Sequence, residues 1–271
     1  MYSLTRQDRS GAALQDMLAC HAYAFHHNAT YGGACGDSPF LSQHKQMILE
    51  LGLQNVLPHS CPPKNNPNHA VVSNAKYLHE ADTSLWTPDW QRFVRTYVEQ
   101  KVPNNLNLNP AECRIVVHIR RGDVTPCCSE QRYSPNSLYL SLIEKYNPDK
   151  SCKVEIYSQS KSFENFEDFA SRGYTLHLDG DPMDAARALL TSKVAILSKS
   201  SFSMVSAVLR DQTYGKVVYT PFRHSPLKGW DYVPVTFIKD MNQRVKQLRN
   251  QNCAAAEKKS STCDTSGTKN R

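Results

Sequence analysis

Two segments of the chain carry charged and hydroxyl side chains in patterns that could bind an anion. The first, residues 116–123, reads VVHIRRGD, so an apolar run ends in His118, two arginines and Asp123. The planar guanidinium group of an arginine can donate two hydrogen bonds to neighbouring phosphate oxygens. The pattern therefore indicates a phosphate-binding group. The alternative is a strand end at which an arginine forms an ion pair with a nearby aspartate.

The second segment, residues 195–203, reads AILSKSSFS and leads into an apolar helical pattern. Its hydroxyl residues are Ser198, Ser200, Ser201 and Ser203. Unpaired backbone amides at the start of a helix, together with these hydroxyls, could converge on an anion. Capping of the helix by a serine accounts for one hydroxyl but not for four. We therefore expect a second group of phosphate ligands here.

Short apolar runs alternate with helical patterns from about residue 111 onward, and they predict how the two segments are positioned. The apolar runs cover residues 114–119, 154–157, 175–178, 194–197 and 217–219. The helical patterns cover residues 137–146, 163–171, 183–192 and 202–210. Such alternation predicts an α/β fold with a doubly wound parallel sheet. Both polar segments then lie at the carboxyl edge of the sheet, where open α/β folds bind ligands.

The first 110 residues have a different character from the rest of the chain. Apolar residues recur at helical spacing over residues 11–27, 41–53 and 90–102, and residues 103–110 are rich in Asn and Pro, as is typical of a linker. We therefore expect four parts. These are an N-terminal domain over residues 1–110, a second domain over 111–235, a helix over 236–250 and a disordered basic tail over 251–271.

Charge and cysteine content narrow the classes of function. Five of the seven net positive charges lie in residues 241–271, so the body lacks the basic face that nucleic-acid binding requires. The nine cysteines include no C-x-x-C pair, so a zinc site is not expected. The chain shows neither a signal peptide nor a membrane span. We therefore expect a cytoplasmic protein with mostly reduced thiols, or a Golgi protein whose anchor is missing. Cys127 and Cys128 are expected to be buried, inert thiols rather than a redox switch.

Taken together, the motifs resemble the donor domain of the superfamily of α1,2-, α1,6- and protein O-fucosyltransferases. The matching features, in order along the chain, are HIRRGD at residues 118–123, IYS at 156–158, Asp184, and SKSSFS at 198–203. The segment RSG at residues 9–11 and the helix after it are similar to a weaker form of the superfamily's N-terminal loop and helix. The resemblance implies a GT-B-like fold, in which two Rossmann-like domains face each other across a cleft. Residues 1–110 would form the acceptor side, and residues 111–235 would bind a nucleotide-sugar donor.

The resemblance also implies an activity and roles for individual residues. Members of the superfamily invert the sugar without a metal, so we expect no cofactor, GDP-fucose as donor, and a glycan or glycoprotein as acceptor. Arg120 would neutralise the diphosphate leaving group, while His118 and Asp184 would contact the diphosphate-ribose and base side of the donor. The other candidates for donor binding are Gly11, Arg121, Ser158, Gln159, Ser198, Ser200, Ser201, Phe202 and Ser203.

Donor identity and catalysis itself have alternatives. Where the superfamily usually has an acidic pair, residues 158–160 read SQS. Because carboxylates recognise guanine well, this departure leaves room for another nucleotide sugar such as UDP-xylose. The N-terminal loop is also altered, with GAA at residues 11–13. A binding module without catalytic activity is therefore a second class of function to test.

Two further assignments stay open from the sequence. An inverting transfer needs a base near the acceptor hydroxyl unless the transition state is loose enough to do without one. Asp123 is the first candidate, with Asp16 and Glu130 as alternatives. The loop that carries Phe222, His224 and Trp230 could line a sugar or base pocket, or it could be a packing corner.

Overall fold

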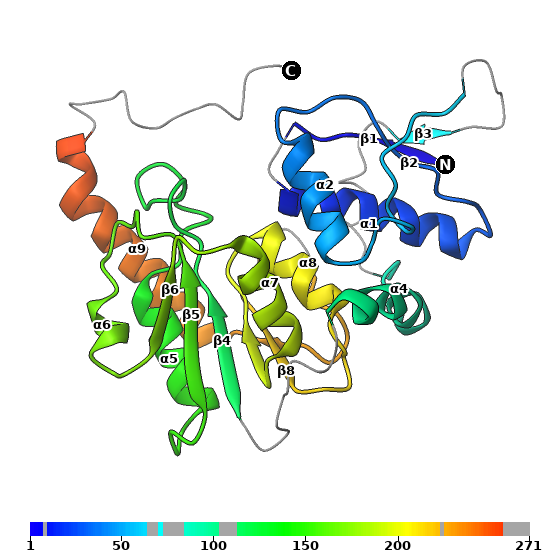
Figure 1. The fold of residues 1–271 in the computed structure, drawn as a ribbon. Helices are drawn as coiled ribbons and strands as arrows, with labels where there is room; N and C mark the ends of the chain where they lie inside the picture. The colour runs from blue at the N-terminus through cyan, green and yellow to red at the C-terminus, as the bar shows by residue number, and fades with distance from the viewer. Residues whose placement is uncertain (8–9, 64–69, 73–83, 103–112, 223–224, 257–271) are drawn as a thin grey trace.

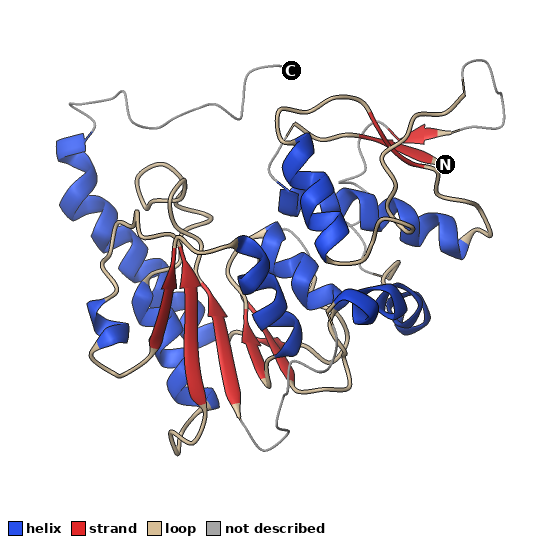
Figure 2. Cartoon of the chain, in the orientation of Figure 1, coloured by secondary structure: helices blue, strands red, loops and turns tan. Residues whose placement is uncertain are grey.

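The computed structural model describes residues 1–7, 10–63, 70–72, 84–102, 113–222 and 225–256. It confirms the predicted α/β class, with two parallel sheets and helices packed against them (Figures 1 and 2). Several sequence predictions fall on residues outside these ranges. They are the linker at 103–110, His224, and the tail beyond residue 256.

The larger sheet has six parallel strands in the order β6-β5-β4-β7-β8-β9. Its strands are β4 (Arg114–His118), β5 (Lys153–Ser158), β6 (Thr175–Leu178), β7 (Val194–Ile196), β8 (Lys216–Tyr219) and β9 (Asp231–Tyr232). The five predicted strands are confirmed, and β9 was missed because two residues form no apolar run. The strands β4 and β7 are direct neighbours, so the two polar segments leave the sheet side by side.

Helices cover both faces of this sheet, as the doubly wound prediction requires. They are α5 (Asn136–Tyr146), α6 (Glu167–Ala170), α7 (Pro182–Thr191), α8 (Ser201–Leu209) and α9 (Val235–Ala256). Side chains alternate along β4, so Val116 packs with α7 and α8, whereas Ile115 and Val117 pack with α5 and α9. The sheet is thus buried on both faces, which explains its near-continuous apolar strands.

The N-terminal part contains a small parallel sheet that the sequence did not reveal. Its elements are β1 (Tyr2–Leu4), α1 (Ser10–His26), β2 (Gly33–Cys35), α2 (Leu41–Glu50), β3 (Val71–Val72) and α4 (Pro88–Lys101). The sheet order is β2-β1-β3, and strands of two or three residues are too short to show a hydrophobic period. The three predicted helices are confirmed as α1, α2 and α4. One hydrophobic cluster joins Leu14 of α1 and Trp90 of α4 to Leu189 and Val205, so α8 packs between the two parts (Figure 1).

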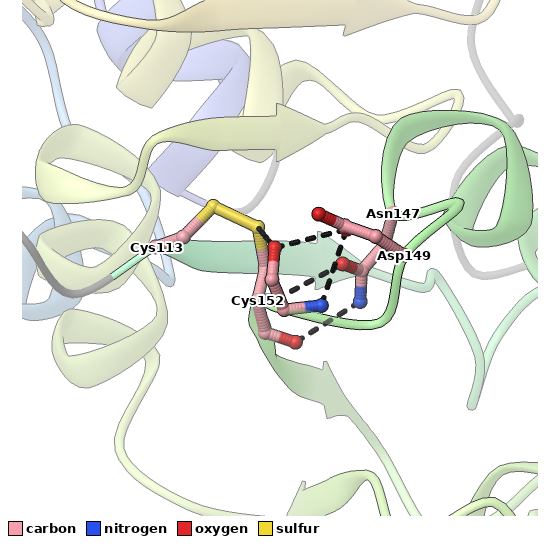
Figure 3. Close-up of a disulfide and its surroundings, with 5 residues drawn as sticks. Cys113, Asn147, Asp149 and Cys152 are labelled. Carbon is pink, nitrogen blue, oxygen red and sulfur yellow. Dashed lines mark hydrogen bonds between the residues drawn. A yellow bond between two sulfur atoms is a disulfide. The ribbon is translucent and has the colours of Figure 1, made fainter.

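Three disulfides whose cysteines both lie in the described ranges overturn the expectation of mostly reduced thiols. They are Cys35–Cys61, Cys113–Cys152 and Cys127–Cys253. Figure 3 shows the second, where the side chain of Asn147 also holds the backbone of Cys152 through two hydrogen bonds of 3.0 Å. Within the described part of the chain, the free thiol is that of Cys20, which is buried. Cys127 and Cys128 are both disulfide-bonded, so neither is the inert free thiol that the sequence predicts. Partners as far apart as 126 residues cannot be paired from spacing alone.

The C-terminal helix is longer than the sequence predicts. The helix α9 continues to Ala256, past the expected end at residue 250, and the disulfide at Cys253 fixes its last turns to the loop after β4. The exposed ion pair between Arg249 and Glu130, at 2.7 Å, lies along the same contact. None of the helices in the described ranges is both long and apolar enough to cross a bilayer.

Candidate anion-binding site at the carboxyl edge of the sheet

The two polar segments meet where β4 and β7 end. The guanidinium Nη1 of Arg120 donates a hydrogen bond to Ser200 Oγ at 3.2 Å. Two residues earlier in each segment, His118 Nδ1 and Ser198 Oγ are 2.7 Å apart. Side chains that lie 80 residues apart in the sequence are therefore in direct contact. The contact follows from the pairing of the two parallel strands, as the sequence predicts.

The start of α8 presents backbone amides that no serine side chain caps. Ser200 is the residue before the helix and has extended backbone angles, but its hydroxyl makes no capping bond and instead accepts from Arg120. The hydroxyl of Ser203 bonds back to the carbonyl oxygens of Ser198 and Ser200, at 3.2 and 3.1 Å. The serines therefore shape the loop, and the amides of the first helical turn keep their capacity to donate to an anion.

A second helix begins at the same place. A Cβ atom on Gly11, in the first turn of α1, would lie 2.6 Å from the backbone nitrogen of Phe202. Only a glycine permits this approach, so the start of α1 rests directly on the start of α8. The ring of Phe202 in turn lies 5.1 Å from the ring of His118, centroid to centroid. The structure thus brings Gly11, Phe202 and His118 into one cluster with Arg120 and the serines.

A tight turn returns Asp123 to the arginine before it. Gly122 has a φ of +79°, which favours glycine, and the turn places Asp123 Oδ2 2.6 Å from Arg120 Nη2. The side chain of Gln159 packs against the same turn, because a Cβ on Gly122 would lie 2.2 Å from Gln159 Oε1. Asp123 therefore orients Arg120 in this structure, which is the alternative to its role as a base.

Arg121 does not belong to the site, contrary to the prediction that it is a donor ligand. Its side chain is fully buried, at 0% exposure, so it cannot touch a donor. The guanidinium donates to Ser134 O at 3.0 Å and to Asn136 Oδ1 at 2.7 Å, and it stacks 4.6 Å from the ring centre of Tyr133. Successive residues after a strand point in opposite directions, so only one of the two arginines can face the cluster. Arg121 fastens the loop after β4 to the start of α5.

The remaining donor candidates lie farther from the cluster or serve the fold. Ser158 Oγ donates to the carbonyl oxygen of Ile119 at 2.8 Å and so ties β5 to the end of β4. Asp184 lies in the first turn of α7 with a largely exposed carboxylate, 3.3 Å from Arg187. Among the described residues, no hydrogen bond or ion pair links Asp184 to Arg120, and its donor contact stays a prediction.

The alternative bases and the aromatic loop have other partners. Asp16 is a buried residue of α1, with its carboxylate 3.1 Å from Arg6, and Glu130 is paired with Arg249. Trp230 is 7% exposed and donates from Nε1 to Gln212 Oε1 at 2.7 Å, which assigns it to packing. Phe222 forms hydrogen bonds through its backbone to the hydroxyl of Tyr219. These contacts favour the packing corner over the pocket for this loop.

The electrostatics of the cluster keep its histidine neutral. Burial, and then the nearby charge of Arg120, lowers the pKa of His118 to about 3. The imidazole therefore carries no charge at neutral pH. It lies within hydrogen-bond distance of Ser198 Oγ, and the cationic character of the cluster comes from Arg120 and the two helix starts.

Two residues of this edge were missed from the sequence. Asp179 directly follows β6, and its Oδ1 accepts from the backbone nitrogen of Ser160 at 3.0 Å, an interaction that lowers the pKa of this carboxyl. Lys199 lies between the two serines that contact His118 and Arg120, and it is 8% exposed. The signals for them were an aspartate directly after a strand and a lysine within a run of hydroxyl residues. In the described ranges, no group of three His, Cys, Asp or Glu side chains could hold a metal ion.

Comparisons with known proteins give only weak structural similarities. No family model and no curated protein sequence matches the chain. A heptosyltransferase of E. coli, WaaC, solved with ADP-2-deoxy-2-fluoro heptose, aligns with 93% of this chain and 100% of its own at 13% identity and a TM-score of 0.44. POFUT1 in complex with GDP aligns with 86% of this chain and 98% of its own at 8% identity and a TM-score of 0.44. The glycosyltransferase TibC of E. coli covers 85% of this chain and 61% of its own at 14% identity and a TM-score of 0.46. These alignments compare the course of the backbone and carry no statement about activity.

Proposed function

We propose that this protein is a glycosyltransferase that transfers a sugar from a nucleoside diphosphate, with GDP-fucose as the first donor to test. The observation that carries the proposal is the contact of Arg120 with Ser200 at the uncapped start of α8. A guanidinium, serine hydroxyls and helix-start amides are the donors that a diphosphate requires. The start of α1 at Gly11 adds a second helix end at the same point.

The chemistry follows from where negative charge develops. The oxygen of an acceptor hydroxyl forms a bond to the anomeric carbon as the bond from that carbon to the diphosphate breaks. The electron pair leaves with the nucleoside diphosphate, and the hydroxyl proton passes to a base or to solvent. A fixed guanidinium and preorganised amides stabilise the departing charge without reorganisation. Arg120 and the start of α8 supply these groups in the proposed reaction, which is inverting and needs no divalent cation.

Donor binding would also change the state of Asp123. In the structure its carboxylate lies 2.6 Å from Arg120. A diphosphate is a stronger and bidentate partner for a guanidinium, so it would compete for this arginine. Asp123 released in this way would become the proton acceptor for the incoming hydroxyl. The base would then be free only when the donor is bound.

The identity of the nucleotide base rests on a different set of groups. The sequence lacks an acidic pair after β5, but the carboxylate of Asp179 lies at this edge and is anchored by the Ser160 amide. A carboxylate can accept from the N1–H and amino group of guanine, and this favours GDP over UDP. Asp179→Asn should therefore weaken binding of GDP while leaving binding of inorganic pyrophosphate unchanged.

The activity is tested by following cleavage of the donor in the presence of EDTA. Purified protein is incubated with GDP-fucose, UDP-xylose or another nucleotide sugar on an array of glycans and glycopeptides. Transfer from one donor with release of its nucleoside diphosphate supports the proposal. Tight donor binding without transfer or hydrolysis of any donor would favour the alternative, a binding module without catalysis.

The disulfides lead us to propose an oxidising compartment as the site of action. Disulfides persist in secreted proteins and in the lumen of the secretory pathway, whereas the cytosol keeps thiols reduced. Cys113–Cys152 lies at the start of β4, and Cys127–Cys253 lies in the loop after this strand. The chain on both sides of β4 is therefore held by a disulfide. Soluble, active protein is expected from an oxidising expression compartment, and equal yield and activity from a reducing one would contradict this.

A further inference from the structure

An open cavity of about 870 Å³ lies at the amino edge of the larger sheet, opposite the edge that carries the candidate site. The starts of β4, β7 and β8 border it, together with β9. Its volume lies in the range of small-molecule sites. The five residues of β4 span about 16 Å at about 3.3 Å per residue, so a ligand in this cavity lies on the far side of the sheet from Arg120. The cavity is therefore separate from the donor site.

Four neighbouring strands begin with a cationic residue at this edge. In sheet order these residues are Lys153 of β5, Arg114 of β4, Lys193 directly before β7, and Lys216 of β8. Neighbouring strands lie about 4.8 Å apart, so the cations form a row. The buried carboxylate of Glu155 lies 3.3 Å from Lys153 and 3.8 Å from Arg114, and it offsets part of the charge at one end of the row. The other end of the row, at β7 and β8, borders the cavity.

The lining of the cavity carries more positive than negative charge. Among the described residues that line it, Lys145, Lys193 and Lys216 are the cations and Asp231 is the carboxylate. Asp231 lies 3.5 Å from Lys216 and accepts a hydrogen bond of 2.9 Å from the hydroxyl of Tyr146. Within the described ranges, no carboxylate forms an ion pair with Lys145 or Lys193, and both are exposed. Two lysines at the cavity are therefore available to an anionic ligand.

The remaining lining of the cavity is partly aromatic. Tyr232, on the edge strand β9, is 54% exposed and lines the cavity together with Tyr146 and Trp230. Its ring packs edge-on at 6.3 Å from that of Tyr219, and Trp230 is fixed by its hydrogen bond to Gln212. An exposed ring offers an apolar face to the C–H groups of a sugar, whereas lysines attract acidic substituents. The lining thus combines the two kinds of group that an acidic sugar needs.

Covalent and polar contacts fix this lining before a ligand arrives. The disulfide Cys113–Cys152 joins the starts of β4 and β5, and Asn147 holds the backbone of Cys152 (Figure 3). Asp231 of β9 in turn holds the hydroxyl of Tyr146 at the end of α5. A preformed site loses little conformational entropy when a ligand binds.

We propose that this cavity binds an acidic saccharide, that is, a glycan with sulfate or carboxylate groups. The row of cations fits a chain with repeated acidic groups, and the exposed ring of Tyr232 fits the face of a sugar. Single-stranded nucleic acid also carries repeated charges, but it binds to a series of rings on which successive bases stack. Among the described aromatic residues of the lining, Tyr232 is the exposed one. The inference goes beyond the proposed function and does not depend on it, because the cavity is separate from the donor site.

The test measures binding of fluorescently labelled hexamers to the oxidised full chain by fluorescence anisotropy. The probes are a heparin hexasaccharide, a hyaluronan hexasaccharide, neutral cellohexaose and hexathymidylate. The wild type should bind at least one of the two acidic saccharides at least about tenfold more tightly than cellohexaose and hexathymidylate. No preference for an acidic saccharide over these two probes would overturn the inference.

A pair of double variants assigns the binding to the cavity. Lys193→Met combined with Lys216→Met should weaken binding of the preferred acidic saccharide by about tenfold. It should also reduce the slope of log affinity against log salt concentration by about two, one for each lysine. Lys45→Met combined with Lys101→Met removes two exposed lysines from α2 and α4 and should bind within about twofold of the wild type. Equal affinities of the two double variants would overturn the inference, because binding would then depend on net charge or on another surface.

Variants of Tyr232 separate recognition of a sugar from attraction by charge alone. Tyr232→Ala should weaken binding of the acidic saccharide by about threefold or more, because the ring that contacts the sugar is lost. Tyr232→Phe keeps the ring and should bind as the wild type does. All the substituted positions are exposed, so every variant should unfold at the temperature of the wild type. Unchanged affinity of Tyr232→Ala would overturn the assignment of the ligand as a saccharide.

Nucleotide binding keeps the two proposals apart. The double variant at Lys193 and Lys216 should bind GDP as the wild type does. If the wild type binds an acidic saccharide in the cavity but no nucleoside diphosphate, the proposed function fails and this inference stands. If the wild type binds GDP but no acidic saccharide, this inference fails and the proposed function stands.

Discussion

Arg120 is the residue on which the proposed chemistry depends most, because it joins the two polar segments and is held by Asp123. Arg120→Lys keeps the positive charge but loses the planar pair of donors. Removing such a stabiliser of a developing anion typically lowers the rate by about 10² to 10³. We therefore expect Arg120→Lys and Arg120→Ala to lose turnover by at least this factor while keeping the unfolding temperature. Arg92→Ala, at an exposed position of α4, is the control. A fully active Arg120→Ala enzyme would refute the assignment.

The neutral histidine predicts a pH dependence of stability. The pKa of His118 is about 3 and that of His21 about 4 in the folded protein, both lowered chiefly by burial. In the unfolded chain a histidine titrates near about 6.5. Between these values the unfolded state binds more protons, so the free energy of unfolding should fall as the pH drops from about 6.5 toward 4. Denaturant unfolding at several pH values measures this slope.

A pair of variants assigns that slope to His118. His118→Gln should give a shallower loss of stability on acidification, because the residue that resists protonation has been removed. His27→Gln changes an exposed histidine at the end of α1 and should leave the slope as it is in the wild type. Equal slopes for His118→Gln and the wild type would show that His118 is accessible to protons in the folded state.

For single residues, the sequence predicted which residue types gather at the site better than it predicted which way their side chains point. The two segments met as expected because strand pairing dictates which residues share an edge. Arg121 was assigned to the wrong side, since the turn after β4 decides which of two adjacent arginines faces the cluster. Lys199 was overlooked because a lysine within a run of hydroxyl residues is normally exposed, and its burial follows from the folded chain alone. Neither property leaves a pattern in the amino-acid sequence.

At the scale of the elements, the site depends on the contact between the starts of α1 and α8. Gly11→Ala would place a methyl group 2.6 Å from the backbone nitrogen of Phe202, so the two helices must move apart. We expect a lower unfolding temperature and weaker binding of nucleoside diphosphates for this variant. Gly180→Ala, at a position with no atom within 4 Å of the added methyl group, is the control. Unchanged binding by Gly11→Ala would remove α1 from the site.

The disulfide between Cys127 and Cys253 fastens α9 to the loop that follows Asp123. It closes a loop of 126 residues, and a crosslink of that span is worth about 3–5 kcal/mol. Cys253→Ser should lower the free energy of unfolding by about this amount, and added reductant should destabilise the wild type more than the variant. Equal unfolding curves for the wild type and Cys253→Ser under oxidising conditions would contradict this contribution of the disulfide to stability.

The elements show which structural features a sequence can reveal. The strands of the larger sheet were recognisable because burial on both faces requires continuous apolar runs. The small N-terminal sheet was not, since its strands are two or three residues long. The disulfides were missed for a related reason, because each joins residues that are neighbours only in the folded chain. Long-range pairing, rather than local propensity, is what the sequence left undetermined.

At the scale of the whole molecule, the two parts of the chain are held together around α8. The helices α1 and α4 and the large sheet share one hydrophobic cluster with it. The start of α8 therefore lies where the N-terminal part meets the sheet, and an anion bound there would contact both. Donor binding is expected to stabilise the whole protein rather than one part of it.

Thermal unfolding with GDP, UDP, ADP and TDP in EDTA shows whether the protein binds a nucleoside diphosphate. A ligand present at 100 times its Kd stabilises the folded state by about 2.7 kcal/mol, which gives a clear rise in the unfolding temperature. GDP should raise the unfolding temperature, guanosine should raise it less, and Arg120→Ala should abolish most of the effect of GDP. A rise with UDP alone would change the donor and leave the site in place. No rise with any nucleoside diphosphate would contradict the claim that the carboxyl edge of the sheet binds the leaving group of a glycosyl transfer.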